Sequence, residues 1–260
     1  MNKILKYGFL DLIRSNWLIL YTGFYLIVSF GVLMANGDIS KSVISLLNVI
    51  IMLIPLIATL YGIIYYYNSR DYVEMLLAQP ITRRSIFMGQ FLGLSLSLST
   101  SFLVGTLIPF LFFGVTESVY LIHFLFLLIA GVFLTFIFCG LSYLLGLAND
   151  NKLKGFGLAI LLWLFFAIIY DGIVVISLVK YEDYPLEKFT LISTLINPID
   201  LSRIFIMLKF DAAALFGYTG ALFNKFFGSG LGLAVALGAL SLWSIVPVWL
   251  IIRIANRKDF

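Results

Sequence analysis

Six long apolar stretches constrain the fold of this chain more than any other feature of its sequence. They lie at residues 17–34, 43–65, 91–113, 119–147, 156–179 and 230–252. A helix needs about 20 mostly apolar residues to cross a hydrocarbon core about 30 Å thick. The stretches therefore predict an all-α membrane protein with six transmembrane helices, organised as one transmembrane domain over residues 1–260.

The composition also places the chain in a bilayer. Of its 260 residues, 62% are hydrophobic and 12% are charged, compared with about 45–50% and about 25% in soluble domains. A single globular core cannot bury so much apolar surface. The net charge of +4 is modest, and its distribution among the loops indicates orientation, so no nucleic-acid partner is expected.

The loop charges predict which side each loop occupies. With a cytoplasmic N-terminus, 11 of the 17 lysines and arginines fall on the cytoplasmic side and six fall outside. Cytoplasmic loops are enriched in these residues, so we expect a multi-pass protein of the cell inner membrane with both termini cytoplasmic. Residues 68–90 are then a cytoplasmic segment, and residues 180–229 an external one.

Residues 1–16 have the pattern of an amphipathic helix. Apolar residues follow the i, i+4, i+7, i+8 spacing at Leu5, Phe9, Leu12 and Ile13. The intervening polar residues are Lys3, Lys6, Asp11 and Arg14. This pattern predicts an interfacial helix that lies on the cytoplasmic leaflet and contacts membrane lipid.

The cytoplasmic segment reads "NSRDYVEMLLAQPITRRSIFMGQ". Its first half predicts a short helix with one apolar stripe and one charged side. The stripe consists of Tyr72, Val73, Leu76 and Leu77, and the charged side of Arg70, Asp71 and Glu74. Pro80 ends the helix, and Thr82 can cap the helix that enters the third span. The helix is either a solvated loop element or a docking site for a cytoplasmic partner.

The external segment is too long for a turn, and we expect it to form one or two short helices on the membrane surface. A seventh span at residues 205–223 is the alternative, but it would place Lys209 and Asp211 in the bilayer at about 2.5–3.5 kcal/mol each.

Within this segment a capped helix start is predicted. Asn197 is the N-cap, Pro198 the first helical residue and Asp200 a first-turn acid that can pair with Arg203. These residues form either a well-capped surface helix or a platform for an external partner.

Few side chains suggest chemistry inside the membrane. Asp171 lies within the fifth stretch, where an acid usually faces a cavity or a partner, although it is also near the outer interface; it is a possible intramembrane polar site. With one histidine, one cysteine and scattered methionines, neither a metal site nor a catalytic set can be assembled. No Gly-x-x-x-x-Gly-Lys-Ser/Thr sequence occurs in the chain, so it has no P-loop to hold the phosphates of ATP.

The stretch "RDYVEMLLAQPITRRSIFMGQFLG" resembles the first cytoplasmic loop of type-2 ABC exporter permeases. That loop has an acidic residue, a Leu-Leu pair, a proline, a hydroxyl residue, an arginine and a Gly-x-x-x-Gly. The corresponding residues here are Glu74, Leu76, Leu77, Pro80, Thr82, Arg83, Gly89 and Gly93. The glycine that often precedes the acidic residue in the family is missing.

The resemblance implies a non-catalytic membrane subunit that works as a homodimer with a cytoplasmic ABC ATPase. This chain would bind no cofactor, and ATP and Mg would bind the ATPase. The short loop helix would be a coupling helix seated in a cleft of that ATPase. The implied coupling residues are Arg70, Asp71, Glu74, Leu76, Leu77, Pro80 and Arg83.

A narrower resemblance concerns the long external segment and its Asn-Pro-x-Asp-x-x-Arg motif. Both are similar to the permeases of nitrous-oxide-reductase maturation systems, in which an ATPase and a periplasmic β-helical protein help to assemble the copper centre. The implied docking residues for the external partner are Asn197, Pro198, Asp200 and Arg203. Two other functions stay open, an exporter of a drug, lipid or gliding component and a membrane scaffold without transport.

Two glycine pairs permit close helix contacts, Gly89 with Gly93 and Gly228 with Gly232. Small residues at this spacing occur both within chains and at dimer seams, and the sequence does not distinguish the two.

Overall fold

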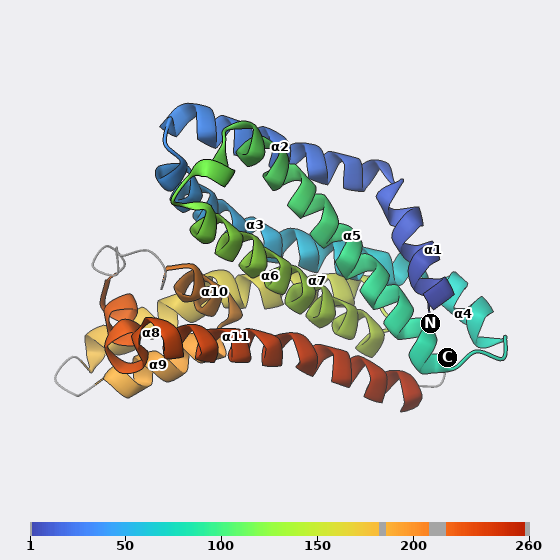
Figure 1. Ribbon diagram of the computed structural model, residues 1–260. Coiled ribbons are helices and arrows are strands. Elements are labelled where there is room, and N and C mark those ends of the chain that lie inside the picture. The colour runs from blue at the N-terminus through green and yellow to red at the C-terminus, as the bar shows by residue number, and fades with distance from the viewer. Residues whose placement is uncertain (1, 182–185, 208–216, 258–260) are drawn as a thin grey trace.

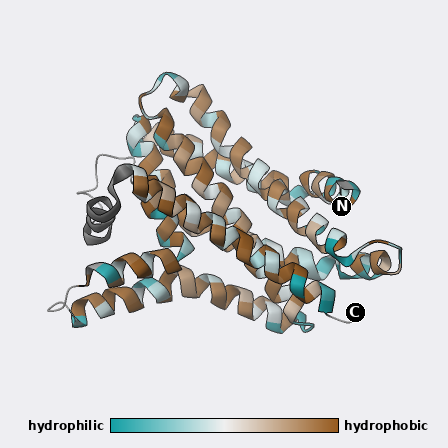
Figure 2. Cartoon of the chain, turned by 60° about the horizontal axis from the view of Figure 1, so that its bottom comes forward, coloured by the Kyte–Doolittle hydropathy of each residue, from teal (hydrophilic) through white to brown (hydrophobic). Residues whose placement is uncertain are grey.

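Each apolar stretch lies, to within two residues at its ends, inside a helical segment long enough to cross a membrane. A computed structural model describes residues 2–181, 186–207 and 217–257, and the side chains of Asn2, Glu187 and residues 217–229 are excluded from that description. The candidate spans are Asn16–Asn36, Ile39–Asn68, Arg83–Phe112, Leu121–Ala148, Lys152–Lys180 and Gly230–Arg257. Hydrophobic residues cover their length, and hydrophilic residues gather toward their ends (Figure 2). The predicted all-α membrane fold with six transmembrane helices is confirmed.

The described helices follow one another with short connections. In chain order they are α1 (Asn2–Ile13), α2 (Asn16–Asn36), α3 (Ile39–Asn68), α4 (Arg70–Leu77), α5 (Arg83–Phe112), the 3-10 turn η1 (Val115–Glu117), α6 (Leu121–Ala148), α7 (Lys152–Leu164), the π-helical turn η2 (Phe165–Ile169), α8 (Tyr170–Lys180), α9 (Glu187–Ile196), α10 (Pro198–Met207) and α11 (Gly217–Arg257).

The two ends of the bundle differ in what they contain. The N-terminus, the last turn of α11, α1 and α4 lie together at one end, which we call the terminal end (Figure 1). The helices α8, α9 and α10 lie toward the other, the far end. Six spans return the chain to its starting side, so this arrangement agrees with the predicted placement of both termini on one side.

Local capping interactions define several helix boundaries. Gly37 ends α2 with φ 62°, a left-handed conformation that glycine adopts without strain. Asp38 then starts α3 by accepting a hydrogen bond from the Ser40 backbone N–H at 3.0 Å. Asn151 starts α7 in the same way, accepting from Leu153 N at 2.9 Å. Short connections of this kind hold successive spans antiparallel.

The helices α3, α5 and α6 form the interior of the bundle. About 61% of the spans of α5 and α6 is buried, compared with 6% of the span built from α7, η2 and α8. Small residues permit close contact, because a Cβ atom at Gly146 would lie 2.6 Å from the Tyr66 ring. The fifth span is therefore the one that turns most of its surface toward lipid or another chain.

The first glycine pair belongs to a contact within this chain. A Cβ atom at Gly89 would lie 2.9 Å from the Ile4 side chain, and one at Gly93 would lie 3.3 Å from the backbone nitrogen of Phe9. The pair thus lets the interfacial helix α1 lie directly against α5. The second pair includes Gly228, whose surroundings fall outside the description.

The external segment is partly helical, as predicted, and one of its helices is packed into the bundle. The helices α9 and α10 form a pair bent by 110°, and α10 packs against α6 and α11. Most of its residues are buried, among them Pro198, Leu201 and Phe205. This helix therefore packs against the bundle on more than one side, because its apolar residues surround it, and its predicted place at the membrane surface stays a prediction. Residues 208–216, central to the alternative seventh span, lie outside the described residues.

We expect Gly93→Val to destabilise the protein by about 1–3 kcal/mol, the usual effect of overpacking a close contact. The added methyl groups would collide with the backbone of α1 at Phe9. Thermal unfolding in detergent measures the effect. Gly23→Val is the matched control, because a Cβ atom at Gly23 meets nothing within 4 Å; equal melting temperatures for the two variants would contradict the intrachain contact.

Candidate functional site

The helix α4 presents a charged surface at the terminal end. Val73 and Leu76 are buried beneath it, Leu77 is partly buried, and Asp71 and Glu74 are exposed. The structure therefore brings together the predicted coupling residues of this helix. Tyr72 departs from the predicted stripe, because it is exposed and lies beside a lateral cavity.

The helix α4 is joined rigidly to the second span. Only Ser69 separates it from α3. The Ser69 backbone N–H donates to Tyr65 O, and the Ser69 carbonyl accepts from Val73 N, both at 2.9 Å. These bonds carry the helical hydrogen bonding from one helix into the next, so a displacement of α4 must also displace the end of α3.

A second loop of the terminal end contacts this junction. The Tyr67 hydroxyl donates to the carbonyls of Asn149 at 2.7 Å and Asn151 at 3.2 Å. Arg70 pairs with Glu74 at 3.1 Å and lies 3.9 Å from Asp150. The loop between α6 and α7 is therefore attached to the start of α4, a contact that sequence reasoning missed. The residues are about 80 positions apart, and no local pattern could have linked them.

The remaining predicted coupling residues lie where α4 turns into α5. Pro80 follows the end of α4, as predicted. Arg83 begins α5, and its Nη1 lies 3.5 Å from the carbonyl of Ala255 near the end of α11. Thr82 precedes α5, but its hydroxyl bonds to the Ser85 side chain at 2.8 Å and makes no capping bond to the backbone. This corner thus connects the third and sixth spans.

Four polar residues meet at the far end, and we call them the far-end polar cluster: Asp171, Asn197, Asp200 and Arg203. Arg203 lies 3.2 Å from Asp200 and 4.0 Å from Asp171. Asn197 donates from Nδ2 to Asp200 at 3.0 Å, with Asp171 at 3.4 Å. The predicted intramembrane site and the predicted docking motif, which seemed separate in the sequence, are therefore one network.

The far-end polar cluster stabilises an irregularity in the fifth span. The π-helical turn η2 interrupts the regular helix just before Asp171. Asn197 Nδ2 also donates to the carbonyl of Phe166 in this turn at 3.0 Å. A second hydrogen bond links α8 to α9: the Tyr170 hydroxyl donates to the carbonyl of Ser193 at 2.7 Å. The bend between α9 and α10 is thereby attached to the π-helical turn.

The structure revises the exposure expected of the docking motif. Asn197 caps α10 through its Oδ1, which accepts from Ile199 N at 3.0 Å, as predicted. However, Asn197 and Pro198 are buried, so their side chains position α10 and do not face a partner. Arg203 and Asp200 keep partly exposed side chains, and these two remain available to an external surface.

Electrostatics favour a proton within the far-end polar cluster. Asp200 lies outside the six candidate spans, and burial raises the pKa of its carboxyl to about 7. The neighbouring carboxylate of Asp171 raises this pKa further, while Arg203 and Asn197 oppose the shift. The cluster thus contains two carboxyl groups and one guanidinium, and a single positive charge cannot neutralise two carboxylates. A cavity of about 190 Å³ adjoins them.

The described residues offer no evident metal site. Within residues 2–181, 186–207 and 217–257, no group of three histidine, cysteine, aspartate or glutamate side chains lies close enough to hold a metal ion. Cys139 is buried in the bundle.

Comparisons with known proteins agree on one family. Residues 33–260 match the sequence profile described as ABC-2 family transporter protein. The chain is 27% identical over 259 residues to the "Probable ABC transporter permease protein NosY" of Pseudomonas aeruginosa, covering 92% of this chain and 89% of that protein. It is 26% identical over 254 residues to the protein of the same name from Stutzerimonas stutzeri, covering 92% and 85%.

We expect Asn197→Ala to destabilise the far end by about 1–3 kcal/mol, the usual cost of leaving buried polar groups without a partner. The change removes the donor to the Phe166 carbonyl and to Asp200. Hydrogen exchange of residues 187–207, together with thermal unfolding, measures the loss. Asn36→Ala is the control, because its amide makes a single bond of 3.3 Å to Ser45; equal protection in both variants would refute the assignment.

The raised pKa of Asp200 predicts a pH dependence of stability. Between the ordinary pKa of 3.8 and about 7, the folded state binds this proton more tightly than the unfolded state, so stability falls as pH rises through that window. We expect the wild type to melt at a lower temperature at pH 8 than at pH 5, and Asp200→Asn to reduce that difference. The exposed Asp38→Asn should leave the difference unchanged, and an identical difference in all three proteins would count against the prediction.

Proposed function

The chain belongs to the ABC-2 family of transporter proteins, and from this premise we propose that it couples ATP hydrolysis on a separate cytoplasmic ATPase to work at the periplasmic side. It is a multi-pass inner-membrane permease subunit. We assign the terminal end to the cytoplasm, where the positive-inside rule places it. The observation that most supports coupling is α4, a short helix with exposed charges joined to the second span by a single residue.

The contacts of α4 suggest how a push from the ATPase reaches the far end. Through Tyr67 and Arg70, the α3–α4 junction contacts the loop before α7. The helix α7 extends about 20 Å from there, at 1.5 Å per residue, to the π-helical turn. That turn is bonded to Asn197 and hence to α10. These contacts form a continuous physical route, and π-helical turns are frequent at functional sites.

The family supports an ATPase partner, and the names of the two relatives suggest which partners to propose. We assign the ATPase to a NosF-like cytoplasmic subunit that binds ATP and Mg, and the external partner to a NosD-like periplasmic β-helical protein. A homodimer is expected because one set of six spans is half of such a transporter. The work at the periplasmic side would be maturation of the copper centre of nitrous oxide reductase, supported by two relatives that carry the name NosY.

The coupling proposal predicts the effect of reversing one charge on α4. Glu74→Arg should reduce ATPase co-purification and permease-stimulated ATP turnover by about tenfold or more, because like charges at an interface cost several kcal/mol. It would also place a second guanidinium beside Arg70. Membrane insertion should be unaffected.

Glu117→Arg is the matched control for this measurement. Glu117 is an exposed glutamate in the turn η1, between the third and fourth spans. Unchanged stimulated turnover in Glu74→Arg would refute the coupling role. Purification with an ATPase but without a copper-enzyme maturation protein would instead support export of a different cargo.

A further inference from the structure

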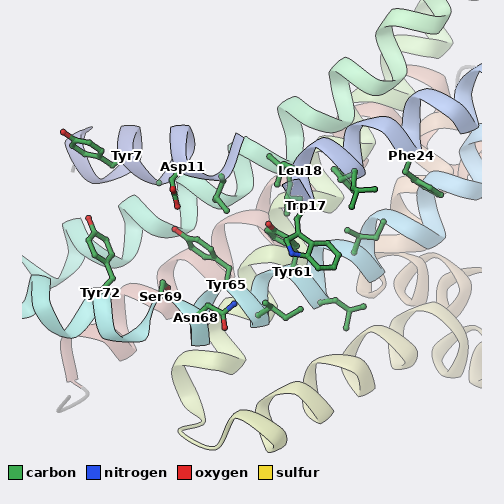
Figure 3. A pocket seen from close by; sticks show the side chains of 18 residues that line it. Tyr7, Asp11, Trp17, Leu18, Phe24, Tyr61, Tyr65, Asn68, Ser69 and Tyr72 are labelled. Atoms are coloured by element: carbon green, nitrogen blue, oxygen red, sulfur yellow. The ribbon is translucent and has the colours of Figure 1, made fainter. Parts of the chain in front are cut away.

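A large lateral cavity lies between the interfacial helix and the first two spans (Figure 3). Its volume is about 1140 Å³, above the range of about 300–1,000 Å³ usual for small-molecule sites. Its walls come from α1, α2, α3, the start of α4 and one residue of α5. The coupling and partner assignments do not use this cavity.

The lining changes from polar to apolar along the cavity. Tyr7, Asp11, Asn68, Ser69 and Tyr72 lie at its terminal end, and Phe24 lies at its other end (Figure 3). The deeper lining is aliphatic and aromatic, with Leu20, Phe24, Ile57, Leu60 and Leu98. A cavity with one polar and one apolar end has the polarity of a single amphiphile.

The dimensions correspond to one membrane leaflet. The part of α3 that lines the cavity runs from Ile57 to Asn68, which is about 17 Å at 1.5 Å per residue. Half of a hydrocarbon core of about 30 Å is about 15 Å. The polar end therefore lies at the headgroup level of the leaflet at the terminal end, and the apolar end lies near the bilayer centre.

The charge at the polar end of the cavity indicates which kind of lipid headgroup it can bind. Among the residues that the structure describes, Asp11 is the only carboxylate that lines the cavity, and no lysine or arginine lines it. The salt bridges of the described residues do not include Asp11. Its carboxylate points toward Tyr65 (Figure 3). An acid among aromatic rings attracts a cation and repels a bare anionic headgroup.

We propose that this cavity binds a lipid with a primary ammonium headgroup, phosphatidylethanolamine, with its ammonium group on Asp11 and its acyl chains along α2 and α3. The three N–H donors of a primary ammonium match the carboxylate of Asp11 and the neighbouring tyrosine, asparagine and serine oxygens. The occupant touches Asn68, Ser69 and Tyr72, which form the α3–α4 junction. If α4 is the coupling helix, as proposed above, the bound lipid also stabilises its position.

Native mass spectrometry of the purified full-length chain, without ATPase, tests the binding. Phosphatidylethanolamine and phosphatidylglycerol with identical acyl chains are the two probes. We expect preferential retention of phosphatidylethanolamine, reduced about tenfold by Asp11→Asn, which corresponds to about 1.4 kcal/mol. Glu117→Gln, which removes a carboxylate outside the cavity, should retain the lipid as the wild type does.

A second pair of variants tests the cavity itself. Ile64→Trp fills the apolar part and should displace either lipid, whereas Ile160→Trp changes an equally exposed residue of α7 and should not. Equal binding of both lipids, or unchanged binding in Asp11→Asn and Ile64→Trp, would overturn the proposal. A photo-crosslink from position 64 to a second copy of the chain would overturn it too, since a protein would then occupy the cavity.

The failure of this proposal is distinguishable from failure of the proposed function. Loss of ATPase recruitment with lipid binding intact would refute the coupling role alone. Intact ATPase stimulation by a protein that shows no Asp11-dependent lipid preference would refute the lipid site alone.

Discussion

The structure depends on one constraint, that the lipid interior offers no hydrogen bonds to the backbone. Regular helices satisfy this constraint by themselves, and irregular backbone needs side chains or neighbouring helices to satisfy it. The π-helical turn η2 and the bend before α10 are two such irregularities, and Asn197 is bonded to both. One buried amide thus permits the fifth span and the external helices to depart from straight helices at the same place.

The same constraint explains how the two ends of the molecule are connected. Helices in lipid are stiff, so contacts at their ends move with the whole element. The terminal end joins α4, α3 and the loop before α7 through Tyr67 and Arg70, and the far end joins α8, α9 and α10 through the far-end polar cluster. The fifth span is the element common to both, and it is also the least buried. A span with few intrachain contacts is the one most free to move.

Much of the fold could be predicted because its determinants are local. Length and hydropathy located all six spans, Pro80 marked the end of α4, and the Asn197-Pro198 pair marked the start of α10. The burial of α10 was not predicted, since it depends on α6 and α11, which lie far away in the sequence. The contacts of Asp171 with Arg203 and of Arg70 with Asp150 also join residues distant in sequence. Spacing rules for single helices do not reach across such distances.

The sequence by itself determined the membrane class, the number of spans and the short amphipathic helices, because hydrophobic length and helical periodicity are properties of neighbouring residues. The tertiary structure alone decided that Gly89 and Gly93 hold α1 against α5, that Asp171 contacts Asn197 and Arg203, and that Asp11 borders a cavity as long as one leaflet. These are properties of helix packing. Packing depends on which side chains meet when whole helices come together, and no single helix contains that information.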